Sequence, residues 1–201
     1  NDNYENILIS FIDKNGIIVN TFTNQNKDSI QKQDYNMELS EFTSNNAAKV
    51  TSKKGYNRFR WNLRHKGIKG KDKEENINGP LVKPGKYKVQ ILVDNKYKIE
   101  DEILILKDPN TVITESDFEK AEELQLKIIN KIREAKSIAD EIQTSISNKK
   151  FRKSKYAPLK QKLDMLVTKE GTYMQPMLID QMKYLYGMIS KADQILGNDA
   201  Y

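Results

Sequence analysis

Apolar and polar side chains alternate in several short stretches of the chain, and the clearest of these runs from Tyr56 to Arg64. In a β-strand, successive side chains point to opposite faces. Phe59, Trp61 and Leu63 would therefore share one face, while the arginines lie on the other. The pattern predicts a half-buried strand with an apolar inner face and a basic outer face.

Four further stretches, 6–12, 16–23, 85–93 and 96–106, are rich in Ile, Val, Phe, Tyr and Thr. Asn15-Gly16 between the first two predicts a tight hairpin, because Gly supplies the positive φ that such a turn needs. Asp94-Asn95 predicts a second turn. A short edge strand is also expected somewhere within 34–52.

Strands with one polar and one apolar face indicate a sheet that is packed on one side. About five to seven such strands over residues 1–108 indicate an immunoglobulin-like β-sandwich.

The pattern changes after Lys107-Asp108-Pro109-Asn110, where a stop is followed by a turn. Thr114-x-x-Asp117 and Ser116-x-x-Glu119 are overlapping capping signals for a helix. Apolar and small residues then recur at alternating spacings of three and four over about eight turns, which predicts a long amphipathic helix. The predicted seam comprises Phe118, Ala121, Gln125, Ile128, Ile132, Ala135, Ala139, Ile142 and Ile146.

Two shorter helices are predicted after the basic segment 148–155. Pro158 and Pro176 suit the first turn of each, and Gly197 suits a C-terminal cap. The predicted apolar stripe of the second helix comprises Leu159, Leu163, Leu166 and Val167, and that of the third comprises Leu178, Met182, Leu185, Ile189, Ala192 and Leu196. Residues 112–201 are therefore expected to form an antiparallel helical hairpin or three-helix bundle. Residues 198–201 resemble the start of another helix, so this unit is expected to be truncated.

Composition narrows the possible functions. The 201 residues include no Cys, which excludes disulfides, thiolate metal sites and cysteine nucleophiles. The net charge of +6 is spread along the chain, without the clustered basic surface typical of nucleic-acid binding. No apolar run approaches the roughly 18 residues of a membrane span. Because the chain starts on Asn1, we expect a processed protein or an excerpt.

Candidate catalytic residues are few. His65 is the single histidine, and a metal site would need carboxylates converging on it. Four carboxylate pairs are candidates for glycoside hydrolysis, but the first lies in a Lys-rich loop and the last two lie on the long helix, where adjacent side chains diverge by about 100° and do not face one substrate. These pairs are Glu74-Glu75, Asp101-Glu102, Glu122-Glu123 and Asp140-Glu141. We therefore predict no catalytic residue, no metal and no cofactor in this segment.

Arg58, Arg60 and Arg64 are the candidate interaction residues. On one strand face they could bind an anionic glycan or phosphate, pair with the acidic run 100–102, or dock onto another domain. The aromatic residues Phe59, Trp61, Tyr87 and Tyr97 could form a carbohydrate platform, but their alternation favours a sandwich core. The methionines Met174, Met177, Met182 and Met188 are interpreted in the same way, as bundle core rather than as a binding groove.

Two motifs in combination resemble a known family. They are Asn57-Arg58-Phe59-x-Trp61-x-Leu63-Arg64 and Gly79-Pro80-Leu81-x-x-Pro84-Gly85-x-Tyr87-x-Val89, followed by a long helix opening on Thr-Glu-Ser-Asp. Lys183-Tyr184-Leu185-Tyr186 with Ala192-Asp193 matches the last helical segment of the same family. Together they resemble the C-terminal region of large bacterial exported proteins labelled sortilin-like or BNR-repeat glycosyl hydrolases.

The resemblance implies an Ig-like module of the flagellar hook-capping type followed by helices, with a β-propeller upstream in the same polypeptide. It implies export to the periplasm, cell surface or medium of a bacterium. The expected function is a non-catalytic accessory region that packs on or presents the propeller, with a cell-envelope complex or glycan as a further possible partner. Two alternatives stay open, a carbohydrate-binding module and part of a glycosidase site that a missing domain completes. Fold analogy does not establish the chemistry of the parent protein.

Overall fold

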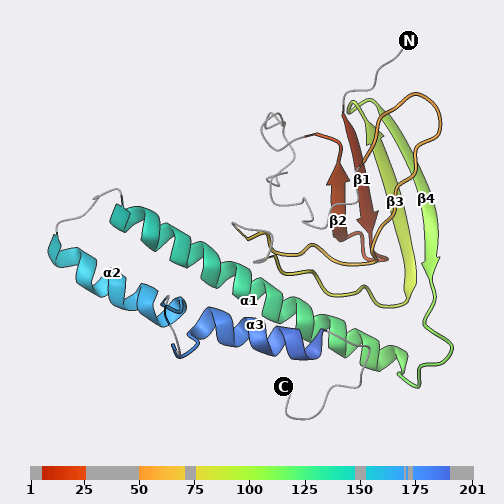
Figure 1. Cartoon of the computed structure of the whole chain (residues 1–201). Helices are drawn as coiled ribbons and strands as arrows, with labels where there is room; N and C mark the ends of the chain where they lie inside the picture. Colours follow the sequence, from red (N-terminus) through yellow and green to blue (C-terminus); the bar gives the residue numbers. More distant parts are fainter. Residues whose placement is uncertain are drawn as a thin grey trace. The chain divides into compact units, whose positions relative to one another are not determined.

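A computed structural model describes residues 6–25, 50–70, 76–147, 153–169, 171 and 174–190. The chain forms two compact units, Asn1–Glu122 and Glu123–Tyr201. The first contains four strands and the second contains most of three helices (Figure 1).

The first unit is built on an antiparallel open sheet with the strand order β2-β1-β3-β4. The strands are β1 (Ile7–Ile12), β2 (Ile18–Thr23), β3 (Gly85–Val93) and β4 (Tyr97–Ile105). β1 pairs with both β2 and β3, so β2 and β4 form the two edges (Figure 1). All four strands confirm sequence predictions to within two residues. The edge strand expected within 34–52 falls almost entirely outside the described residues.

Both predicted turns have the expected backbone chemistry. In the β1–β2 turn, Asp13 Oδ1 accepts the N–H groups of Asn15 and Ile17, and Gly16 has a φ of 83°. In the β3–β4 turn, Asp94 and Asn95 have φ values of 49° and 56°. Such positive φ values match the right-handed twist of a hairpin, and Asn and Asp tolerate them best after Gly.

An aromatic cluster forms the centre of the core on one face of the sheet. The Phe11 ring stacks on Trp61 with 3.9 Å between centroids, and it meets Phe22 edge-on at 6.0 Å. Phe59 packs against Phe22, and Trp61 contacts the edge of Tyr87. Aliphatic side chains complete the cluster, namely Ile7, Ile9, Val19, Val50, Val82, Val89, Ile91, Ile103 and Ile105. The prediction that Phe59, Trp61 and Tyr87 are core residues is therefore confirmed.

The predicted strand from Tyr56 to Arg64 is wrong, although two of its three predicted inward residues, Phe59 and Trp61, do pack inward. The segment is extended but has no strand pairing until Arg64, which bridges Leu81. Leu63 has a φ of 55°, so the alternation breaks there and its side chain is exposed instead of sharing the face of Trp61. The Trp61 indole N–H donates to the Arg64 carbonyl at 3.1 Å, which closes this bend.

Residues 63–68 and 77–82 form an irregular antiparallel ribbon. Its backbone hydrogen bonds join His65 N–H to Pro80 C=O at 2.9 Å and Val82 N–H to Leu63 C=O at 2.9 Å. A second bridge pairs Ile68 with Ile77. The two strands of this ribbon approach so closely that a Cβ on Gly79 would lie 2.0 Å from the His65 carbonyl oxygen.

The long helix α1 (Glu115–Ser147) begins as predicted. The Thr114 Oγ1 accepts the Asp117 N–H at 3.2 Å, and Asp117 Oδ2 accepts the Thr114 N–H at 3.1 Å. This reciprocal capping box satisfies backbone donors that the first helical turn leaves without partners. The buried residues of α1 include the predicted Ile132, Ala135 and Ala139, together with Ile129, which the predicted seam omits.

Two details of the shorter helices differ from prediction. Helix α2 (Lys153–Leu166) begins five residues before Pro158, which therefore lies inside the helix. Helix α3 (Leu178–Ile189) buries Ile179, Tyr186 and Ile189. The predicted Leu178 and Leu185 are 45% and 40% exposed.

The predicted and observed stripes of α3 share Met182 and Ile189, but Ile179 and Tyr186 replace Leu178 and Leu185, and each stripe satisfies the spacing of three and four. Packing against the other helices selects the one led by Ile179. A shared apolar cluster joins Ala135 and Ala139 of α1, Leu163 and Leu166 of α2, and Ile179 and Met182 of α3.

Among the four methionines interpreted as bundle core, Met182 does pack against this cluster. Met174 and Met188 are instead about half exposed. The predicted Ala192, Leu196 and Gly197 lie outside the described residues. Within the described ranges, no helix has the length and apolarity needed to cross a membrane.

Thr168 supplies the cap that α3 lacks in its own N-cap residue, Met177. The Thr168 hydroxyl accepts the Met177 N–H at 2.9 Å and donates to the Asp180 carboxylate at 2.5 Å. Lys183 Nζ lies 2.9 Å from the other oxygen of Asp180. Partial burial acts to raise the pKa of Asp180, but these hydrogen bonds and the charge of Lys183 outweigh it and lower the pKa.

We expect the hydrogen bonds of Asp180 to make the free energy of unfolding depend on pH in the acidic range. Because the folded pKa lies below the ordinary value of about 3.9, the stabilisation is complete above that value and is lost as pH falls. At pH 7, Asp180→Asn should cost about 1 kcal/mol or less, since the side chain is 39% exposed and screened by solvent. Thermal melts at pH 7 and pH 3 should show this difference shrinking at pH 3. An equal difference at both pH values would contradict the expectation, and Glu141→Gln on the exposed face of α1 is the matched control.

Candidate interaction surfaces

The three candidate arginines do not form one stripe. Arg58 and Arg60 are exposed, and neither has a hydrogen-bond or ion-pair partner among the described residues. Arg64 instead turns inward, and its Nη1 donates to the Gly79 carbonyl at 2.9 Å. The break at Leu63 is the cause, because it rotates Arg64 off the face of the other two. Arg64 therefore fastens the ribbon, while Arg58 and Arg60 remain available as a surface.

Tyr56 extends this surface, because its side chain is 91% exposed. Beneath it, Asn57 is held by its own loop, where its amide donates to the carbonyls of Lys53 and Gly55 at 2.7 and 3.1 Å. Phe59 alternates with the arginines and packs inward on the aromatic cluster. We call Tyr56, Arg58 and Arg60 the arginine face. The backbone of the arginine face is held in place by the hydrogen bonds of Asn57 and by the packing of Phe59, while its own three side chains point outward.

His65 belongs to a second cluster, which the sequence did not reveal. Its Nε2 lies 2.8 Å from Glu122 Oε1, and the two side chains are only 14% and 12% exposed. The same Glu122 oxygen accepts the Lys83 N–H at 3.1 Å. Lys83 Nζ reaches Glu119 Oε1 at 2.6 Å and Glu122 Oε2 at 3.7 Å. The first two turns of α1 are thereby tied to the ribbon and to the loop before β3.

Electrostatics keeps Lys83 and Glu119 of this cluster ionised. Burial acts to lower the pKa of Lys83, but its hydrogen bond to Glu119 and the charges of both glutamates outweigh this effect and raise it. The hydrogen bond from Lys83 lowers the pKa of Glu119. Burial, assisted by the charge of Glu122, raises the pKa of Tyr87, which remains a neutral phenol donating to the Lys83 carbonyl at 2.8 Å. Every contact of Glu122 named here goes to the framework of the same unit, so we interpret the cluster as structural.

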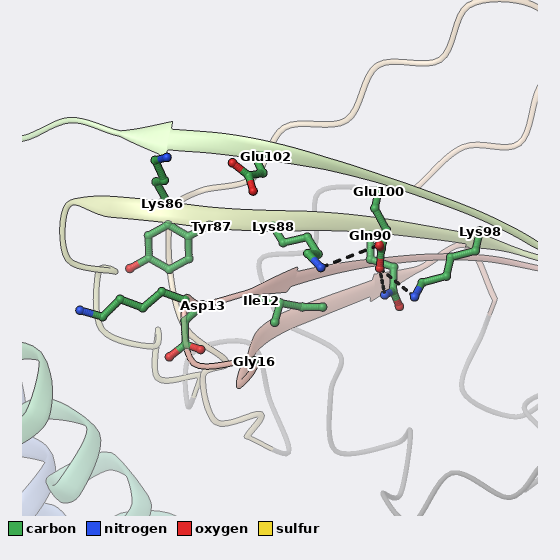
Figure 2. Close-up of a pocket in the computed structure, with 11 residues that line it drawn as sticks. Ile12, Asp13, Gly16, Lys86, Tyr87, Lys88, Gln90, Lys98, Glu100 and Glu102 are labelled. Carbon is green, nitrogen blue, oxygen red and sulfur yellow. Dashed lines mark hydrogen bonds and ion pairs between the residues drawn. The ribbon is translucent and has the colours of Figure 1, made fainter.

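A third feature is an open groove of about 560 Å³ on the polar face of β3 and β4 (Figure 2). Residues two apart on a strand share a face, and the register sets Lys88 of β3 opposite Glu102 of β4 and Gln90 opposite Glu100. Glu100 is its best-ordered member. Lys98 Nζ lies 2.8 Å from Glu100 Oε1, and Gln90 Nε2 donates to the same oxygen at 2.8 Å. The lining comprises Ile12, Asp13, Lys14, Gly16, Lys86, Tyr87, Lys88, Gln90, Lys98, Glu100 and Glu102.

The groove offers charged and amide side chains for polar recognition. Hydrogen bonds from Lys98 and Gln90 lower the pKa of Glu100, so its carboxylate is ionised at neutral pH. Lysines and carboxylates nearly balance along the lining, which suits a neutral polar ligand better than a polyanion. The suggestion that the arginines pair with the acidic run 100–102 is wrong for Glu100, whose ionic partners are Lys98 and Lys88.

The candidate carboxylate pairs do not converge. Asp101 and Glu102 are neighbours on β4 and so point to opposite faces, while Glu123 is exposed beside the largely buried Glu122. Glu74-Glu75 lies outside the described residues. Within the described part of the chain, no group of three or more His, Asp or Glu side chains is placed to hold a metal ion. Tyr97 is 60% exposed, whereas the other residues of the candidate aromatic platform lie in the core.

No protein-family model, curated protein or solved structure matches this chain.

Proposed function

We propose that this chain is a non-catalytic accessory region of a larger exported bacterial protein, which packs on or presents a β-propeller of the same polypeptide. Its sheet unit would be an Ig-like module of the hook-capping type, with the ribbon of 63–68 and 77–82 opposing the sheet. The combination of the Asn57–Arg64 and Gly79–Val89 motifs supports this reading.

The arginine face is the observation that carries the proposal. Arginine and tyrosine are enriched at protein interfaces and supply many of the residues that dominate binding energy. Arg58 and Arg60 have no ionic partner among the described residues. Their neighbours Phe59 and Trp61 are packed in the core, so docking would cost little further ordering of the backbone. The partner surface would be acidic and would include an apolar area that contacts the Tyr56 ring.

Hydrogen exchange tests this docking directly. Amides of 56–62 should exchange at least about tenfold more slowly in the longer encoded polypeptide than in the 201-residue chain, because a docked surface opens less often. The double variant Arg58→Glu, Arg60→Glu should remove that extra protection. Lys131→Glu on exposed α1 is the matched charge reversal and should leave it intact. Equal exchange of 56–62 in the two wild-type proteins would overturn the proposal.

A further inference from the structure

The outer edge of β4 carries a charge pattern that is complementary to itself. We propose that two copies of this chain associate by pairing β4 antiparallel with β4, centred on Ile99. The two sheets would then join into one continuous sheet with twice as many strands. This surface is separate from the arginine face, so the two proposals stand or fall independently.

β4 has the features of a strand open to pairing. It is the last strand in the order β2-β1-β3-β4, so only one of its sides is paired among the described residues (Figure 1). It is nine residues long, and its first six residues are all exposed. Ile99 is 59% exposed at the centre of that stretch. The outer edge of such a strand presents a row of backbone N–H and C=O groups that can template another strand.

Charges on this strand decide which register can form. In a two-fold antiparallel pair centred on Ile99, Lys98 of each copy lies opposite Glu100 of the other. Tyr97 lies opposite Asp101, and Lys96 in the turn comes opposite Glu102. Directly opposed residues in an antiparallel pair project to the same side, so these opposite charges meet. The two-fold axis doubles each contact.

Neighbouring registers lack this match. Centring the pair on Lys98, Glu100 or Glu102 sets that residue against its own copy, and like charges directly opposite are destabilising. Centring it on Ile103 sets Glu102 against Leu104 and Asp101 against Ile105. Charged residues on an edge strand ordinarily discourage pairing. On β4 they discourage the other registers and favour the one centred on Ile99.

The self-complementarity of β4 is the reason to name a second copy as the occupant. A different protein would need its own basic–apolar–acidic strand, whereas each copy of β4 already carries Lys98, Ile99 and Glu100 in that order. An interface built on one strand is small, so association should be weak and visible only with rising protein concentration.

Sedimentation velocity of the 201-residue chain over a concentration series is the test. We expect a reversible monomer–dimer equilibrium. Lys98→Glu and Glu100→Lys, made singly, should each lower the dimer association constant by at least about tenfold, because two symmetric attractive pairs become repulsive. Trp61 emission should be unchanged in both, which shows that the fold is kept. Lys131→Glu, 65% exposed on α1 in the wild type, is the matched control and should leave the dimer unchanged.

Mixing the two single variants gives the decisive result. Carboxylates of one chain then face ammonium groups of the other, so heterodimers should form although neither variant self-associates. The double variant Lys98→Glu, Glu100→Lys should again form homodimers. A wild-type chain that stays monomeric at every concentration would overturn the proposal. So would a dimer that is insensitive to both reversals, because it would use another surface.

Discussion

Phe11→Ala is expected to destabilise the sheet unit by about 3–5 kcal/mol, which is the usual cost of truncating a buried phenylalanine. Phe11 is 5% exposed and contacts Phe22, Phe59 and Trp61 at once. Truncation removes buried apolar surface and also leaves a cavity that a stacked indole cannot fill. Since domains have only about 5–15 kcal/mol of stability, this change should remove a large part of it.

Urea denaturation followed by Trp61 emission measures this loss, because the indole stacks directly on the deleted ring. Leu106→Ala is the matched control, since Leu106 is 76% exposed and its truncation should cost less than about 0.5 kcal/mol. If Phe11→Ala cost no more than the control, the aromatic cluster would not be the core of this unit.

Gly79→Ala is expected to cost about 3 kcal/mol or more, at or above the upper end for overpacking. A Cβ at this position would lie 2.0 Å from the His65 carbonyl oxygen and 2.9 Å from the Lys66 carbonyl carbon. Both are backbone atoms, so the ribbon itself must move. That movement would strain the His65–Pro80 hydrogen bond and the Arg64 contact to the Gly79 carbonyl.

Gly187→Ala provides the opposite expectation in the same chain. No atom lies within 4 Å of a Cβ built on Gly187, which is inside helix α3. Alanine restricts the unfolded chain and favours helix, so this change should stabilise by about 0.5–1 kcal/mol. Thermal melts of the two variants against wild type should therefore shift in opposite directions. A Gly79→Ala melt equal to that of the wild type would refute the close approach of the ribbon strands.

Local patterning predicted the elements well where one physical signal dominated. β1 to β4 follow from alternation and turn residues, and the start of α1 follows from its capping box. The predicted stripe of α3 is right at Met182 and Ile189 but has Leu178 where Ile179 is buried, because these two residues are equally apolar and only packing against other helices distinguishes them. The start of α2 was also predicted wrongly, because a single proline does not distinguish the first turn of a helix from a later position.

Site residues that depend on distant contacts could not be predicted. His65 and Glu122 are 57 positions apart, and no periodicity links them. Arg64 left the expected stripe because Leu63 adopts a φ of 55°, a conformation that its side chain gives no reason to expect. In contrast, the period of two on β3 places Lys86, Lys88 and Gln90 on one face directly from the sequence. What the alternation could not show is that these residues line a groove.

The contacts of Glu119 and Glu122 have a practical consequence for dividing the protein. A fragment ending at residue 108, where the strand pattern stops, would lose both carboxylates. The His65 imidazole and the Lys83 N–H would then lack the acceptor that they share. The first two turns of α1 therefore supply hydrogen-bond acceptors that the sheet unit needs. A fragment of the sheet unit that keeps these contacts includes about two turns of α1, which the sequence pattern groups with the other helices.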